Sequence, residues 1–91
     1  MTGTGDYSRQ RLARLEALAA RLSGQGLSAR LLGTDDPVLS VRHPGTGRQT
    51  IVFATPSGEG WMFLWAPGGQ ESADDPGRAA ELIGQALSRP P

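Results

Sequence analysis

The stretch QTIVFATPSGEGWMFLWA, residues 49–66, decides the expected fold of this chain. It contains two runs rich in β-branched and aromatic residues, 49–54 and 61–66, separated by turn-forming residues at 56–60. So short a connection joins antiparallel neighbours, because parallel strands need a crossover of about a dozen or more residues. The stretch therefore predicts two antiparallel strands joined by a tight turn.

Two further strand-like runs precede this pair. Residues 27–32 and 38–42 are separated by the turn 33–37, and Pro37 suits the start of a strand because it has no N–H to donate to a ladder. The turn HPGTG at 43–47 leads into the run that begins at Gln49. Consecutive strands with short connections predict a four-stranded antiparallel meander in sequence order.

An amphipathic helix is expected before the strands and another after them, because apolar residues recur there at steps of three and four. Asp6 or Ser8 is expected to cap the first helix, which should end near Ser23, and Asp74-Asp75-Pro76 reads as the start of the second. The expected buried stripes are Leu12, Leu15, Leu18, Ala19 and Leu22, and then Ala79, Leu82, Ile83, Ala86 and Leu87. The predicted fold class is α+β with two layers, in the order α-β-β-β-β-α.

The length of 91 residues fits one domain. We expect this single α+β domain to cover residues 8–89. Residues 1–7 contain two glycines and show no periodicity, so they are expected to form a flexible N-terminal segment, and residues 90–91 a C-terminal tail.

Composition excludes several classes of function. The chain has no cysteine, so it can form no disulfide, thiolate zinc site or cysteine nucleophile. Its formal net charge of zero supplies no overall field for polyanions, and we expect no nucleic-acid partner. Because we find neither a long apolar run nor a signal-peptide core, we expect a cytoplasmic protein that neither enters membranes nor is exported.

No motif predicts catalysis, a cofactor or a metal. His43 is the only imidazole and falls at a turn, without an orienting partner at a fixed spacing. The pairs Asp35-Asp36 and Asp74-Asp75 each precede a proline and fit turn or capping chemistry. The segment 45–48, GTGR, lacks the rest of any phosphate-binding fingerprint. We therefore do not expect an enzyme.

Both faces of the expected sheet carry apolar residues, which is the main functional clue. One face is expected to carry Leu39, Val41, Ile51 and Phe53, together with Trp61, Phe63 and Trp65. If the helices cover that face, Val38, Val52, Met62 and Leu64 remain open, and if they cover the other, the tryptophans are exposed. Either arrangement leaves an apolar patch of the kind that marks contact surfaces, unless loops cover it.

The candidate contact residues are apolar side chains of the sheet and two arginines that flank the turn at 43–47. They are Trp61, Phe63, Trp65, Val52, Met62, Leu64, Arg42 and Arg48. The leading hypothesis is a non-enzymatic adaptor or regulatory protein-binding module, homodimeric or partner-binding through the free sheet face or an edge strand. The alternative is a small-ligand binder with a pocket between the sheet and the 67–75 loop, where a tryptophan stacks on the ligand and Arg42 or Arg48 holds an anionic group.

Two resemblances accompany this interpretation. The composition and the run GWMFLWAPGG at 60–69 resemble small uncharacterised proteins of actinobacterial type. The order of helix, sheet and helix is similar to that of bacterial secretion-chaperone-like adaptors, which dimerise and bind segments of partner proteins. This second resemblance implies a protein partner or a second copy of the chain.

Overall fold

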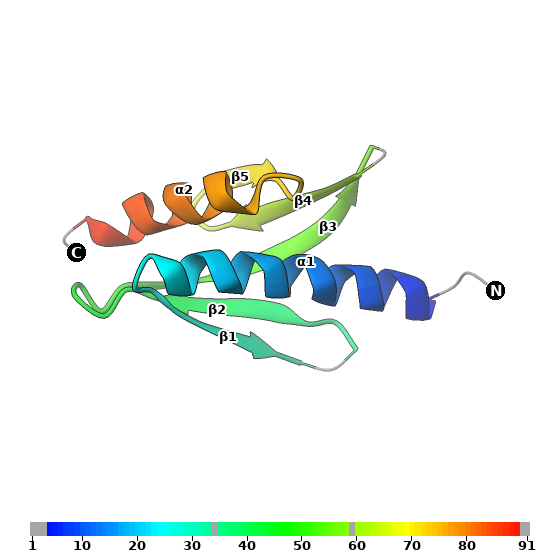
Figure 1. The fold of residues 1–91 in the computed structure, drawn as a ribbon, viewed down its shortest axis with the longest axis horizontal. Helices are drawn as coiled ribbons and strands as arrows, with labels where there is room; N and C mark the ends of the chain where they lie inside the picture. Colours follow the sequence, from blue (N-terminus) through cyan, green and yellow to red (C-terminus); the bar gives the residue numbers. More distant parts are fainter. Residues whose placement is uncertain (1–3, 34, 59, 90–91) are drawn as a thin grey trace.

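The computed structural model describes residues 4–33, 35–58 and 60–89, and it has two layers, with both helices on one face of an antiparallel sheet (Figure 1). The predicted α+β class is confirmed. In chain order the elements are α1 (Thr4–Gly24), β1 (Ser28–Leu32), β2 (Val38–Arg42), β3 (Gln49–Ser57), β4 (Gly60–Trp65), β5 (Gly69–Ser72) and α2 (Pro76–Ser88).

The sheet has five strands in the order β1-β2-β3-β4-β5, and the expected count of four is therefore corrected. The additional strand, β5, pairs antiparallel with β4, from Trp65 opposite Gly69 to Met62 opposite Ser72. Its sequence, GQES, has no β-branched or aromatic residue and therefore no strand signal of its own. The strand forms because the chain reverses at Gly68, with φ 71°, and returns along the free edge of β4.

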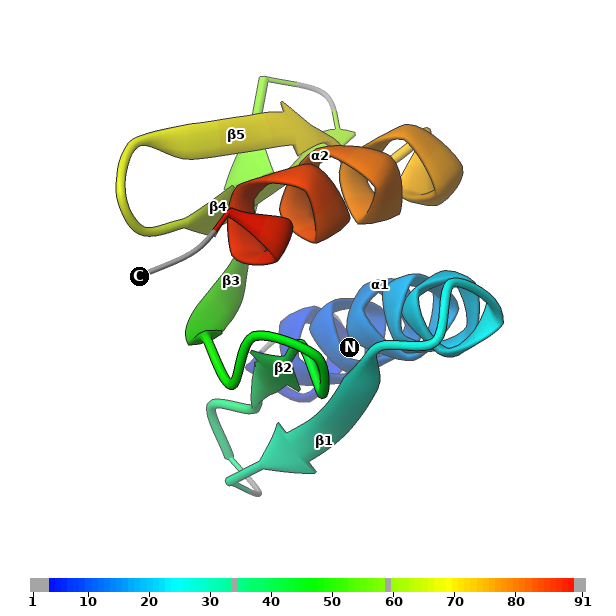
Figure 2. The same cartoon turned by 90° about the vertical axis from the view of Figure 1, so that its left-hand side faces the viewer.

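The long strand β3 connects two halves of the sheet. Its first part, residues 49–52, pairs with β2, and residues 52–57 pair with β4. Figure 2 shows α1 over the β1–β2 half and α2 beside the β4–β5 half. Each helix therefore covers its own part of one shared face.

Helix α1 begins at Thr4, earlier than the expected start near Ser8, and ends at Gly24. Ser8 lies inside the helix and is therefore not its cap, and its Oγ donates to the carbonyl oxygen of Asp35 at 3.2 Å. Residues 4–7 of the expected flexible segment are therefore helical, whereas residues 1–3 and 90–91 lie outside the described residues. Leu12, expected in the buried stripe, is 37% exposed.

Helix α2 begins as predicted. Asp75 is the N-cap and its Oδ1 accepts a hydrogen bond from the backbone N–H of Arg78 at 3.0 Å, while Pro76 occupies the first helical position. Ile83 and Leu87 are buried on the side that faces the sheet, as expected.

The strand register decides which residues form the core. The face beneath the helices carries eight buried side chains on β2, β3 and β4, namely Leu39, Val41, Thr50, Val52, Ala54, Trp61, Phe63 and Trp65. The expectation that Ile51 and Phe53 share a face with Leu39 is wrong, because the register sets Leu39 opposite Val52. Alternation along β3 then turns Ile51 and Phe53 to the uncovered face.

Candidate functional site

The uncovered face of the sheet carries a row of apolar side chains that crosses the strands. The register sets Leu32 opposite Val38 and Phe53 opposite Leu64, and its continuation from Leu39 and Val52 places Val38 beside Phe53. We call these four residues the apolar row. Phe53 is 51% exposed and Leu32 40% exposed, whereas Val38 and Leu64 are half-buried.

Two more apolar side chains extend this row along the strands. Ile51, which is 37% exposed, lies two residues from Phe53, and the half-buried Met62 lies two residues from Leu64. Phe63, on the opposite face of the same sheet, is 0% exposed, whereas Phe53 is 51% exposed. A contiguous exposed apolar patch of this kind is typical of contact surfaces in soluble proteins.

The charges on the uncovered face are all of one sign. Arg30 pairs across the strands with Ser40, and Arg42 pairs with Ser28, so both arginines lie on the same side of the apolar row. Both are exposed, and no aspartate or glutamate among the described strand residues shares their face. The one acidic strand residue, Glu71, pairs with Phe63 and therefore lies on the opposite face.

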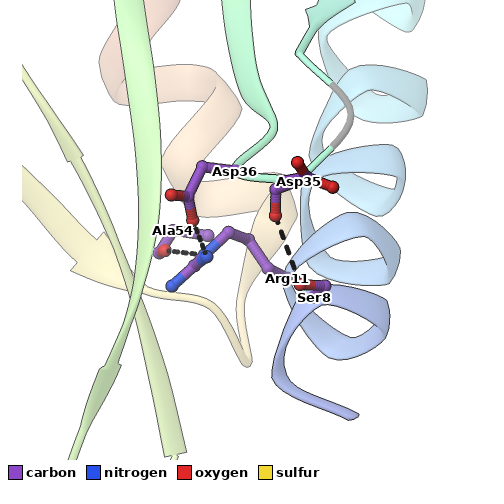
Figure 3. Close-up of polar contacts among 5 residues, drawn as sticks. All are labelled: Ser8, Arg11, Asp35, Asp36 and Ala54. Carbon is purple, nitrogen blue, oxygen red and sulfur yellow. Dashed lines mark hydrogen bonds and ion pairs between the residues drawn. The ribbon is translucent and has the colours of Figure 1, made fainter. Parts of the chain in front are cut away.

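A hollow of about 450 Å³ lies beside the apolar row, on the side away from Arg30 and Arg42. Its walls include Arg11, Asp36, Val38, Phe53 and Leu64. Figure 3 shows Arg11 reaching from α1 to the β3 backbone, where its Nε donates to the carbonyl oxygen of Ala54 at 3.1 Å. Its Nη1 lies 2.7 Å from Oδ1 of Asp36, so this carboxylate is already paired.

The proline just before β2 explains why the Ala54 carbonyl is available to Arg11. Continuing the β2–β3 register past Leu39 and Val52 would set Ala54 opposite Pro37, which has no N–H. The carbonyl of Ala54 would then lack a ladder donor, and a buried carbonyl without a partner is costly. The guanidinium of Arg11 supplies that donor and links α1 to the sheet.

Replacing Arg11 with methionine should lower the free energy of unfolding by about 1–2 kcal/mol, because the Ala54 carbonyl loses its donor while the apolar packing of the stem is retained. Asp36→Asn is the matched control and should cost at most about 0.5 kcal/mol, because the Asp36 side chain of the Arg11–Asp36 ion pair is 90% exposed to solvent. Urea unfolding followed by circular dichroism measures both changes. Equal effects of the two variants would show that the ion pair, and not the carbonyl contact, stabilises this junction.

The structure separates the predicted contact residues into two groups. Trp61, Phe63, Trp65 and Val52 lie in the core beneath the helices, so the prediction that Val52 stays open and the alternative of exposed tryptophans are both wrong. On the uncovered face lie Met62, Leu64 and Arg42. Sequence reasoning had not named the most exposed members of the patch, Leu32, Ile51 and Phe53, as contact residues.

Arg48 and His43 belong to the turn between β2 and β3. Arg48 Nη1 donates to the carbonyl oxygen of Arg89 at 3.3 Å, beyond the end of α2. Nδ1 of His43 accepts hydrogen bonds from the backbone N–H groups of Gly45 at 3.0 Å and Thr46 at 3.1 Å. Its lone pair is therefore engaged in shaping the turn, which agrees with the expectation that His43 is a turn residue.

The 67–75 segment differs from the loop assumed for the ligand-binding alternative. Residues 69–72 are the strand β5, and the nearby hollow of about 370 Å³ is lined by Arg48, Phe53, Pro67 and Leu87, among others. Neither tryptophan lines this hollow, because both are buried under the helices. Stacking of a ligand on Trp61 or Trp65 is thus incompatible with this arrangement.

Within the part of the chain that the structure describes, no group of three or more His, Cys, Asp or Glu side chains is placed to hold a metal ion. None of the described helices combines the length and the apolar character needed to cross a membrane. Comparisons with protein families, with individual proteins of known function and with solved structures found no match to this chain. The site itself therefore carries the functional argument.

Proposed function

We propose that this protein is a non-enzymatic adaptor or regulatory protein-binding module that uses the uncovered face of its sheet. The observation that supports the proposal is the apolar row. Its residue Phe53 is 51% exposed, although Val38 and Leu64 lie beside it on the two neighbouring strands. Leaving such a patch in water forgoes about 25 cal/mol for each Å² that a partner would bury. A cytoplasmic setting, consistent with a chain that lacks cysteine, is part of the proposal.

The occupant of the face is either a second copy of the chain or another protein, and an edge strand provides a second mode of contact. The edges of the sheet are β1 and β5, and β5 packs against α2. The edge of β1 carries the arginine Arg30 at its centre, and a two-fold pairing of β1 strands about that residue would set like charges opposite each other. The face is therefore favoured over the β1 edge.

Phe53→Asp tests the proposal, with Gln85→Asp on the exposed surface of α2 as the matched control. Light scattering on the chromatographic peak gives the absolute mass, and a display library of random helical peptides supplies binders to the wild-type protein. We expect either a dimer near twice 9.6 kDa that Phe53→Asp converts to a monomer, or peptide binders that Phe53→Asp weakens at least about tenfold.

The control Gln85→Asp should change neither the mass nor the peptide affinity. A monomer that selects no peptide, or one whose binders are unaffected by Phe53→Asp, would contradict the proposed role of this face. A dimer that survives Phe53→Asp would show that the contact lies outside this face and would also contradict it. Tryptophan emission would not report whether the face is occupied, because Trp61 and Trp65 are buried on the opposite face.

A further inference from the structure

The charge distribution around the apolar row is asymmetric, and this asymmetry indicates which charge a partner should carry beside its apolar contacts. On one side of the row lie Arg30 and Arg42, and among the described residues neither has an ion-pair partner. On the other side lies the turn at 33–37, where the carboxylate of Asp36 is paired with Arg11 at 2.7 Å and Asp35 is a second, exposed acidic residue. The charged strand residues on one side of the apolar row are therefore positive and the turn on its other side is acidic, although the formal net charge of the whole chain is zero.

The direction of the row indicates the shape of the partner segment. The row runs across β1 to β4, and neighbouring strands lie about 4.8 Å apart, so it extends over about 14 Å. An added strand would lie along a sheet edge and could not follow a row that crosses the strands. A helix lying across the strands can follow it, because apolar residues at i, i+3 or i+4, and i+7 form a stripe about 10 Å long.

The arginines lie where the flank of such a helix would run. Arg30 is two residues along β1 from Leu32, about 7 Å away, and Arg42 is four residues along β2 from Val38, about 13 Å away. Arginine side chains are long enough to lean toward the row and to meet carboxylates in charge-assisted hydrogen bonds. Carboxylates on the opposite flank would instead approach Asp36.

We infer that the uncovered face binds an amphipathic helix of a partner protein, with an apolar stripe on the row of Leu32, Val38, Phe53 and Leu64 and an acidic flank against Arg30 and Arg42. This inference rests on the proposed function and specifies the chemistry of its partner. The acidic flank gives the complex its orientation, since only one direction of the flank meets the arginines. Specificity then comes from the charges and affinity mainly from the apolar row.

The test uses a display library of helical peptides with a fixed apolar stripe and with Glu, Gln or Lys at equal frequency on one flank. Peptides selected on the wild-type protein should be enriched in Glu on that flank. Their affinity, measured by fluorescence anisotropy, should fall at least about tenfold in the double variant Arg30→Glu/Arg42→Glu, because attraction becomes repulsion. The double variant Arg9→Glu/Arg21→Glu on α1 changes the net charge equally and should bind like the wild type.

The salt dependence provides a second readout. The selected acidic peptides should bind more weakly as ionic strength rises, because exposed charge pairs are screened within about 10 Å at 0.1 M salt. Exchange of flank Glu for Lys in one selected peptide should reverse its preference between the wild type and Arg30→Glu/Arg42→Glu. Such a reversal identifies these two arginines, and not general charge, as the partners of the flank.

Each remaining outcome overturns the inference, and the outcomes separate it from the proposed function. Peptides that depend on Phe53 but show no excess of Glu would leave the face as a contact surface and remove the acidic partner. A wild-type dimer that Phe53→Asp dissociates would show that a second copy occupies the face. Binding of single-stranded oligonucleotides that Arg30→Glu/Arg42→Glu abolishes, with no peptide enriched in Glu, would replace the acidic helix with a nucleic acid.

Discussion

Phe63→Ala should lower the free energy of unfolding by about 3–5 kcal/mol, the largest single effect we expect. Phe63 is 0% exposed at the centre of the covered face, opposite Ala54 on β3. Truncation removes the buried ring and leaves a cavity that close-packed neighbours cannot fill. A loss of this size is a large fraction of the total stability of a small domain, typically about 5–15 kcal/mol.

The matched control is Phe53→Ala, the same chemical change on the opposite face of the neighbouring strand. Because Phe53 is 51% exposed, its removal should change the free energy of unfolding by less than about 1 kcal/mol. Urea unfolding followed by circular dichroism compares the two variants, and Phe63→Leu gives a milder core change if Phe63→Ala does not fold. Similar losses for Phe53→Ala and Phe63→Ala would contradict the assignment of the two faces.

Trp61→Ala should cost about 3–4 kcal/mol and should loosen the N-terminal half of α1. The Trp61 Nε1 donates to Oε1 of Gln10 at 3.0 Å, Arg11 lies 5.7 Å from the ring centroid, and the Tyr7 ring lies 6.2 Å away. These contacts hold the first turns of the helix against β4, and without the indole the turns lose their main anchor.

Hydrogen exchange at the amides of residues 9–14 measures this loosening, and it should be faster in Trp61→Ala than in the wild type. Trp61→Phe keeps most of the buried area but not the Nε1 donor, so it should cost only about 1–2 kcal/mol and leave exchange in α1 nearly unchanged. Unchanged exchange in Trp61→Ala would mean that other contacts, such as those of Leu15, Leu18 and Leu22, hold α1 in place without Trp61.

The main elements of the fold follow from local signals. The leucine spacing around Leu15, Leu18 and Leu22 predicts α1, and Asp75 followed by Pro76 predicts the start of α2. The strand β5 has no such signal, because its pairing depends on the position of β4 after the turn at Gly68. The early part of α1 has a tertiary contact that helical periodicity does not indicate, because the Tyr7 ring lies 6.2 Å from the ring of Trp61.

The contact face was harder to predict because it depends on register as well as on alternation. Alternation shows that Phe53 and Val52 point in opposite directions, but it does not say which of them faces the helices. The turn between β3 and β4 contained the missing information, since Ser57 pairs with Gly60 and this register sets Phe53 opposite Leu64 and Val52 opposite Trp65. Counting back from that turn would have placed Phe53 on the face opposite the tryptophans.

Methyl NMR of the wild-type protein with a peptide selected from an unbiased helical library tests the central claim most directly, because the selection does not presuppose where the peptide binds. A contact on the uncovered face predicts the largest shift changes at the methyl groups of Leu32, Val38, Ile51 and Leu64. Changes concentrated instead on α1 and α2, or around the turn at His43, with these methyl groups unperturbed, would contradict the claim that the sheet face around Phe53 is the binding surface.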